Sequence, residues 1–131
     1  MPPRFETLAD WLSWQEQLHS SAVDLGLERI RAVLERLAPD LSSAVIITVG
    51  GTNGKGSTLA FLDAIYRRAG YRTGLFTSPH FVDYCERIRI DGDKVTESDL
   101  CAAFAAIDEA RGDISLTYFE FSTLALSLIH I

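Results

Sequence analysis

The sequence predicts an α/β fold in which a parallel sheet is flanked by helices, and three observations lead to this prediction. Residues 44–49 (Ala-Val-Ile-Ile-Thr-Val) are rich in β-branched residues and apolar on both faces, which is typical of a buried central strand. Glycines follow at once, and residues 57–69 have the pattern of a helix. Residues 71–77 supply a second strand, so the order of elements is that of a right-handed βαβ unit.

Two helices are expected ahead of this unit. Within residues 7–18, apolar side chains recur at roughly helical spacing, at Leu8, Trp11, Leu12, Trp14 and Leu18. Gly26 precedes a second helix, whose apolar face is expected to hold Leu27, Ile30, Val33, Leu34 and Leu37. Pro39 and Asp40 end that helix.

A hairpin and two more helices are expected after the unit. Residues 87–91 alternate between apolar and polar, and with Gly92 and residues 94–95 they predict a small hairpin. Residues 96–99 resemble a capping box, with Asp99 in place of the usual Glu, and open a helix through residue 110. Residues 111–113 break that helix, and Thr117 begins another.

Length, composition and net charge indicate which kinds of binding partner to expect. The 131 residues have room for one domain of ordinary size, and no apolar run is long enough to span a membrane. A net charge of −6 argues against non-specific nucleic-acid binding, which needs a basic surface. The polar N-terminus has no secretory signal, and the two cysteines form no C-x-x-C pair. We therefore expect a cytoplasmic protein without nucleic-acid or membrane partners.

The glycine-rich segment at residues 50–57, Gly-Gly-Thr-Asn-Gly-Lys-Gly-Ser, lies where a phosphate-binding loop must lie, between a buried strand and a helix. Its glycines allow successive backbone N–H groups to face phosphate oxygens, and the helix adds its positive end. Lys55 can reach the β- and γ-phosphates, and Ser57 offers a hydroxyl toward Mg²⁺ or phosphate. The alternative is a glycine-rich turn with a solvated lysine, which the flanking strand and helix disfavour.

The loop departs from the common pattern G-x-x-x-x-G-K-[ST]. Val49 stands where the first glycine belongs, and Gly56 separates Lys55 from Ser57. An ordinary P-loop kinase or GTPase is therefore a poorer match.

Four ordered segments resemble the Mur-ligase superfamily, and in particular its branch of bifunctional dihydrofolate synthases/folylpolyglutamate synthases. They are the ATP loop at residues 51–57, the pterin-side segment at 24–29, the loop 77–81 running on to 86–89, and the stretch 111–121. The resemblance implies an incomplete N-terminal P-loop ATPase domain of a Mur-ligase-like fold.

The resemblance also implies the chemistry. Enzymes of this family use ATP and Mg²⁺ to join L-glutamate to dihydropteroate and to folates through an acyl phosphate, and they act as monomers. By this resemblance, the ATP site comprises Thr52, Asn53, Gly54, Lys55, Gly56 and Ser57, with Lys55 as its catalytic residue. Ser78 is the implied Mg²⁺ ligand, and Ser57 is a second candidate.

Two segments are implied to bind pteroate. They comprise Asp24, Leu25, Gly26 and Leu27, and Thr117, Tyr118, Phe119 and Glu120. A flat pterin ring needs an aromatic surface and a few hydrogen-bonding groups, which these residues can supply. The structural alternatives are a core role for the aromatic residues, including Phe121, a helix cap for Asp24 and a turn for Ser78.

The domain prediction assigns residues 1–125 to part of an ATP-binding domain, with the C-terminal glutamate-binding domain of the family absent. Residues 126–131, Leu-Ser-Leu-Ile-His-Ile, can be encoded by CTGTCTCTTATACACATC, which looks like a transposon adapter used in library preparation. We therefore expect this tail to be non-native, the alternative being a native apolar helix. A fragment of this kind is expected to be inactive alone. The competing functions are another Mur-type amino-acid ligase and, if the native chain is this short, a non-catalytic ATP-binding module.

Overall fold

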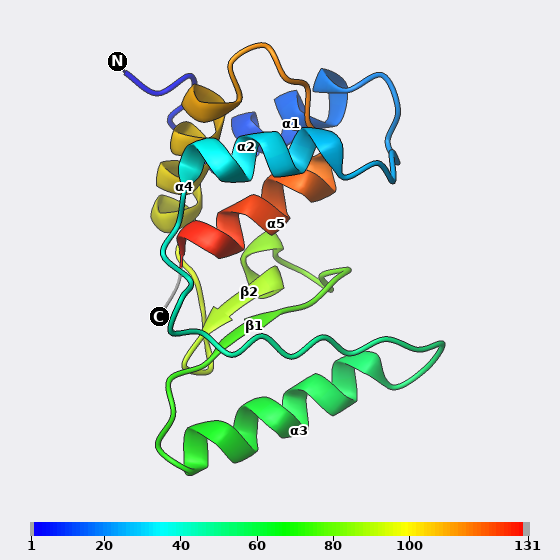
Figure 1. Cartoon of the computed structure of the whole chain (residues 1–131), viewed down its shortest axis with the longest axis vertical. Helices are drawn as coiled ribbons and strands as arrows, with labels where there is room; N and C mark the ends of the chain where they lie inside the picture. Colours follow the sequence, from blue (N-terminus) through cyan, green and yellow to red (C-terminus); the bar gives the residue numbers. More distant parts are fainter. Residues whose placement is uncertain (1, 130–131) are drawn as a thin grey trace. The chain divides into compact units, whose positions relative to one another are not determined.

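The computed structural model describes residues 2–129 (Figure 1). The chain divides into two compact units. The first, called here the helical unit, comprises described residues 2–40 and 96–129, and the second, the α/β unit, comprises residues 41–95.

The helical unit consists of α1 (Leu8–Leu18), α2 (Glu28–Leu37), α4 (Glu97–Arg111) and α5 (Tyr118–Leu128). All four helices were predicted. Helix α4 packs against each of the other three, and α5 also contacts α1 and α2. The core is apolar and aromatic, with side chains at most 2% exposed at Trp11, Val33, Leu100, Phe104, Ile107, Leu116, Phe121 and Leu124.

Side-chain caps mark where three of these helices begin. The hydroxyl of Thr7 accepts the N–H of Asp10 at α1, and Thr96 forms the predicted capping box with Asp99 at α4. Thr117 and Glu120 form a second capping box at α5. Helix α4 ends at Gly112, whose φ of 56° lies in the region that favours glycine.

The α/β unit contains α3 (Lys55–Arg68), β1 (Gly74–Phe76), the short 3₁₀ helix η1 (Tyr84–Arg87), β2 (Ile88–Ile90) and β3 (Asp93–Lys94). The strands form an antiparallel sheet of order β1-β2-β3, with Leu75 opposite Arg89 and Ile90 opposite Asp93. The hairpin was predicted, whereas the antiparallel pairing of β1 was not.

The prediction of a central parallel strand at residues 44–49 is wrong for the described chain. No strand is present there, and the side chains are exposed, by 88% at Val45, 74% at Ile46 and 48% at Ile47. A central strand needs hydrogen-bonded neighbours, and the described residues provide none for this segment. The βαβ pairing therefore does not form, although the expected helix does, beginning at Lys55 instead of Ser57.

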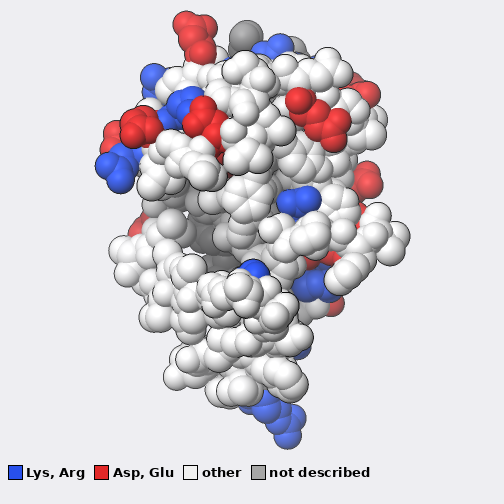
Figure 2. All heavy atoms as spheres, turned by 90° about the vertical axis from the view of Figure 1, so that its right-hand side faces the viewer, with Lys and Arg blue, Asp and Glu red and all other residues white. Residues whose placement is uncertain are grey.

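Further features bear on the sequence predictions. Residues 126–128 continue α5, while His130 and Ile131, part of the expected non-native tail, lie outside the described residues. Neither Cys85 nor Cys101 is in a disulfide. Within residues 2–129, no helix is both long enough and apolar enough to cross a membrane. The face of the molecule drawn in Figure 2 carries interspersed acidic and basic side chains beside broad uncharged areas.

Candidate functional site

The glycine-rich loop leads directly into α3. Gly54 is the residue before the helix and has a φ of 74°, a conformation that side-chain-bearing residues rarely adopt. No side chain caps this helix end, and the first backbone bond that closes it runs from the N–H of Thr58 to the carbonyl of Gly54, at 2.9 Å. The N–H groups of the first turn thus lie at the end of a 14-residue helix, an arrangement suited to an anion.

Lys55 lies in this first turn, with its side chain folded back over the loop. Its ammonium donates to the carbonyl of Gly51 at 2.5 Å. Residues 50–58 are exposed. The space beside the loop is open, because a Cβ added at Gly50, Gly54 or Gly56 would meet no atom within 4 Å. The loop therefore places the Lys55 ammonium and exposed backbone beside a helix N-terminus, which are the features of a phosphate-binding site.

Ser78 lies in the loop after β1 and is exposed. This loop is held from both sides: the N–H of Thr77 donates to the carbonyl of Arg87 at 2.9 Å, and Glu86 accepts the N–H groups of Phe81, Val82 and Asp83. These N–H groups, that of Asp83 foremost, hold the pKa of Glu86 below its usual value.

A divalent cation has few protein ligands in the described chain. No group of three or more His, Cys, Asp or Glu side chains within residues 2–129 is arranged to hold one. Hydroxyl oxygens such as those of Ser57 and Ser78 suit a hard cation, but a cation bound there needs further oxygen ligands from elsewhere.

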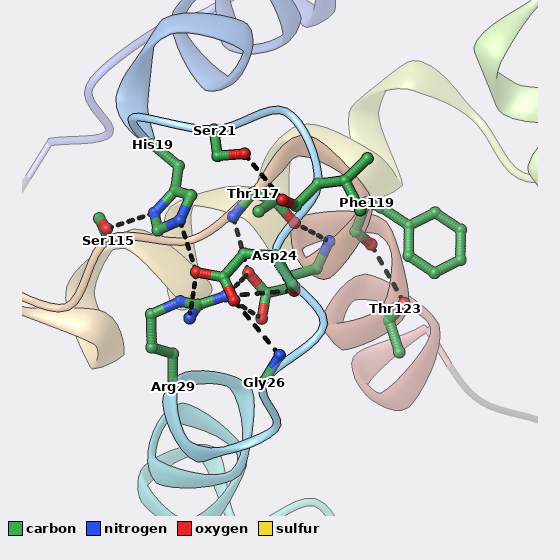
Figure 3. A network of polar contacts seen from close by, with 11 residues as sticks. His19, Ser21, Asp24, Gly26, Arg29, Ser115, Thr117, Phe119 and Thr123 are labelled. Carbon is green, nitrogen blue, oxygen red and sulfur yellow. Dashed lines mark hydrogen bonds and ion pairs between the residues drawn. The ribbon is translucent and has the colours of Figure 1, made fainter.

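In the helical unit, Arg29 joins the two predicted pteroate segments (Figure 3). Its Nη1 lies 2.8 Å from Asp24 Oδ2, and its Nη2 lies 3.0 Å from Glu120 Oε1. The Arg29 side chain is 22% exposed and that of Glu120 is 9% exposed, so the pair is largely shielded from water. The carboxylate of Glu120 raises the pKa of Arg29, and this arginine therefore holds the two segments together as a permanent cation.

His19, the residue that follows α1, contacts Asp24 and so joins Asp24, Arg29 and Glu120 in one polar cluster. Its Nε2 lies 3.1 Å from Asp24 Oδ2, and its Nδ1 lies 2.6 Å from the hydroxyl of Ser115. In a neutral ring, a proton on Nε2 satisfies both contacts, because Nε2 then donates to Asp24 and Nδ1 accepts from Ser115.

Asp24 is held in its charged form. The N–H of Gly26 holds the pKa of its carboxyl below the usual value, and hydrogen bonds from His19 and Arg29 act in the same direction. The alternative of a helix cap is wrong for Asp24, because Leu27 is the residue before α2 and no side chain caps that helix.

Glu120 is buried and, besides its contact with Arg29, makes two local hydrogen bonds with Thr117. Its Oε1 accepts the N–H of Thr117 at 2.9 Å, and its own N–H donates to the Thr117 hydroxyl at 3.2 Å. Its carboxylate is therefore engaged in positioning the start of α5. Of the aromatic residues at this end, Phe121 is in the core at 0% exposure, while Phe119 is 48% exposed.

Two surface hollows flank the segment at residues 24–27. One, of about 550 Å³, is lined by Leu25, Gly26, Leu27, Glu28, Arg31, Ala32 and Glu35. The other, of about 300 Å³, is lined by Gln15, Glu16, His19, Ser21, Ala22, Thr117, Tyr118 and Phe119. Of the predicted pteroate residues, 25–27 line the larger hollow and 117–119 line the smaller one. Asp24 and Glu120 line neither hollow and belong to the polar cluster around Arg29.

Sequence reasoning missed two members of this cluster. Arg29 lies in the segment at residues 24–29 but was assigned no role of its own, and none was assigned to His19. Their partners are distant in sequence, 91 residues from Arg29 to Glu120 and 96 from His19 to Ser115, so spacing carries no signal for them.

Comparisons with known proteins reveal close relatives. The chain is 50% identical over 124 residues to dihydrofolate synthase/folylpolyglutamate synthase of Escherichia coli K12, covering 95% of this chain and 29% of that protein. It is 49% identical over 120 residues to the enzyme of the same name from Haemophilus influenzae, covering 90% of this chain and 27% of the relative. The chain thus spans less than a third of the length of these curated relatives. No family model matches it.

Solved structures give the same result. E. coli FolC in complex with DHPP and ADP superposes with a TM-score of 0.91 at 49% identity, over 97% of this chain and 31% of that one. The Yersinia pestis bifunctional synthase complexed with AMPPNP and Mn ion gives a TM-score of 0.90 at 47% identity, over 98% and 32% of the two chains. The chain is therefore a homologue, over most of its length, of dihydrofolate synthase/folylpolyglutamate synthase and shares the α/β fold of these Mur-ligase-like enzymes.

Proposed function

We propose that this chain is the ATP- and pteroate-binding part of an ATP-dependent ligase that joins L-glutamate to dihydropteroate and to folates. The observation that carries the proposal is the glycine-rich loop that opens α3 without a side-chain cap, in a chain homologous to enzymes of this activity. The relatives are more than three times as long, so ligation is proposed for the complete protein and not for these residues alone.

The reaction requires activation of a carboxylate. Transfer of the γ-phosphoryl group of ATP to the carboxylate of the pteroate gives an acyl phosphate and ADP. The amine of glutamate then attacks the acyl carbon, an amide bond forms, and phosphate and a proton leave. Residues that hold the triphosphate in line with the carboxylate accelerate the first step by positioning and by offsetting charge.

We assign ATP binding to the loop at residues 52–57. Its backbone and the N-terminus of α3 would hold the phosphates, and Lys55 would leave the Gly51 carbonyl to contact the β- and γ-phosphates. Because Lys55 touches the transferred group in this proposal, it is the catalytic residue that the chain contributes. Mg²⁺, when bound, offsets the negative charge that develops on the phosphates. Ser78 is proposed as its ligand, with Ser57 as a second candidate.

For pteroate, we propose the face of the helical unit around residues 24–27 and 117–120. Phe119 is half-exposed beside the smaller hollow and offers an aromatic surface to a flat ring. Asp24 and Glu120 are held by Arg29, so their part in binding is to position the backbone of both segments. Leu25, Gly26 and Leu27 line the larger hollow.

We also propose that residues 1–125 are part of a larger ATPase domain, with residues 126–131 a non-native tail. The exposure of Val45, Ile46 and Ile47 supports a larger domain, because further strands beside residues 44–49 would cover these side chains. Long-read sequencing of the native gene beyond the codon for Ala125 tests this. A frame that continues into a second domain agrees with the proposal, whereas a native stop codon after Ile131 would leave a nucleotide-binding module without ligase activity.

Two further properties are proposed with this function. The complete protein is expected to act as a monomer in the cytoplasm, on small-molecule substrates. The presence of two cysteines outside any disulfide is consistent with a reducing compartment.

Replacement of Lys55 tests the function most simply. Lys55→Ala in the complete protein should abolish ligation, while circular dichroism and the melting temperature stay close to those of the unaltered protein, because Lys55 is exposed and bonds only within its loop. Turnover at the unaltered rate would place the phosphates elsewhere. A Mur-type ligase of another specificity would instead consume ATP in response to a muramoyl nucleotide.

A further inference from the structure

Gln15 is a buried polar residue whose side chain has no partner. It lies in α1 and is 1% exposed, yet neither Oε1 nor Nε2 makes a hydrogen bond among the described residues. Burial of a carboxamide in this way is unfavourable, because its hydrogen bonds to water are lost and not replaced. Buried polar groups in folded proteins nearly always have a hydrogen-bond partner, and a bound ligand could supply one to Gln15.

The position of Gln15 indicates where that partner binds. Gln15 lines the smaller hollow, at the N-terminus of α5 and beside Thr117, Tyr118 and Phe119. The volume of about 300 Å³ lies at the lower end of the range for small-molecule pockets, roughly 300–1,000 Å³.

Three neighbouring polar side chains of this hollow, those of His19, Ser21 and Thr117, already have hydrogen-bond partners. Both ring nitrogens of His19 are bonded, to Ser115 and Asp24. The hydroxyl of Ser21 donates to the carbonyl of Val23 at 2.7 Å, and that of Thr117 accepts the N–H of Glu120. The carboxamide of Gln15 therefore brings to the hollow a donor and an acceptor, side by side, that the protein does not use.

We propose that Gln15 is a specificity-determining residue that hydrogen-bonds the amide edge of a bound pteridine ring. This inference rests on the proposed function, which places pteroate at this face. A pterin carries a ring N–H beside a carbonyl, the same pair of groups as a carboxamide in the opposite order, so two parallel hydrogen bonds can form. Phe119, half-exposed in the same hollow, supplies the aromatic surface for the face of the ring.

The proposal predicts opposite effects on binding and on stability. Leucine is close to glutamine in size, so Gln15→Leu removes two unpartnered buried polar atoms and keeps the packing. The unliganded protein should be as stable as before, or more stable. Binding of a pteridine should weaken about tenfold or more, because the polar edge of the ring loses its partners. A glutamine without a role in binding would instead leave the affinity for the pteridine unchanged.

The test uses the 131-residue chain and pteroate as the probe. Gln17→Leu is the matched control, since Gln17 is an exposed glutamine on the same helix. Titration calorimetry gives the Kd for pteroate, and tryptophan fluorescence in urea gives the stability of each variant without ligand. The expected result is a Kd raised about tenfold in Gln15→Leu alone, at undiminished stability.

The possible outcomes separate this inference from the proposed function. Equal Kd values for Gln15→Leu and Gln17→Leu, with the unaltered chain binding pteroate, would overturn the role of Gln15 and leave the pteroate site standing. A loss of stability in Gln15→Leu that matches the loss of binding would also overturn it. Failure of the unaltered chain to bind pteroate would contradict the proposed site itself, and the inference with it.

Discussion

Replacement of Arg29 by methionine should destabilise the helical unit. The substitution keeps most of the apolar stem but removes the guanidinium, which lies 3.0 Å from Glu120 and 2.8 Å from Asp24. The Glu120 carboxylate, 9% exposed, would then retain its backbone partner at Thr117 without a counter-charge.

The size of the effect follows from the burial of this pair. Removal of one partner from a fully buried ion pair costs about 3–5 kcal/mol, and hydrogen bonds to charged groups contribute about 1.5–3 kcal/mol. The Arg29 side chain is 22% exposed, so water stabilises part of the pair and the lower range applies. We expect the free energy of unfolding to fall by about 2 kcal/mol.

Urea unfolding followed by tryptophan fluorescence measures this loss. Both tryptophans, Trp11 and Trp14, lie on α1, so their emission reports on the helical unit. Arg31→Met is the control, because Arg31 is an exposed arginine of the same helix and its loss should change stability by no more than about 0.5 kcal/mol. A change in Arg29→Met as small as that of the control would refute the idea that Arg29 holds the two segments together.

Three further predictions concern other residues. The depressed pKa of Asp24 means that its contribution to stability is complete above the usual carboxyl pKa and is lost as the pH falls through the folded value. Asp24→Asn should therefore flatten the acid limb of the pH–stability profile, and an unchanged limb would contradict the shift. Gly54→Ala, at a φ of 74°, should cost about 1–2 kcal/mol and weaken ATP binding in equilibrium dialysis, whereas Gly56→Ala should leave the fold intact by circular dichroism. Phe121→Ala should cost about 3–5 kcal/mol in the urea assay because it empties a core site, while Phe119→Ala should leave stability nearly unchanged and weaken pteroate binding in calorimetry.

Elements that depend on local sequence were predicted well. The helices of the helical unit have their apolar spacing and their caps within a few residues, as Thr96 with Asp99 shows. The hairpin of β2 and β3 is equally local. The helix after the glycine-rich loop was placed two residues late, because Gly56 is a poor helix former and only the left-handed conformation of Gly54 marks the true start.

Features that depend on distant partners were not predictable. Residues 44–49 have the composition of a buried strand, but a strand exists only with hydrogen-bonded neighbours, and the described chain supplies none. Arg29 and His19 reach partners 91 and 96 residues away. In the sequence, Gln15 is simply a polar residue of an amphipathic helix. That it is buried without a partner follows only from the packing of α1 against α5.

The resemblance of four motifs indicated the family, and the comparisons confirm it through homology over 95% of the chain. The residue-level roles at residues 24–27, 52–57, 78 and 117–120 stay predictions. The structure shows their surroundings: an uncapped helix start at the loop, an exposed serine at 78 and a clustered pair of segments around Arg29.

The most direct measurement of the central claim is substrate-dependent ATP turnover by the complete protein, with the amide product followed in the same reaction. The account predicts that ADP and glutamylated product appear in equal amounts, that both need dihydropteroate or a folate together with L-glutamate, and that Lys55→Ala forms neither. ATP consumption that ignores pteroate, or that begins on addition of a muramoyl nucleotide, would contradict it.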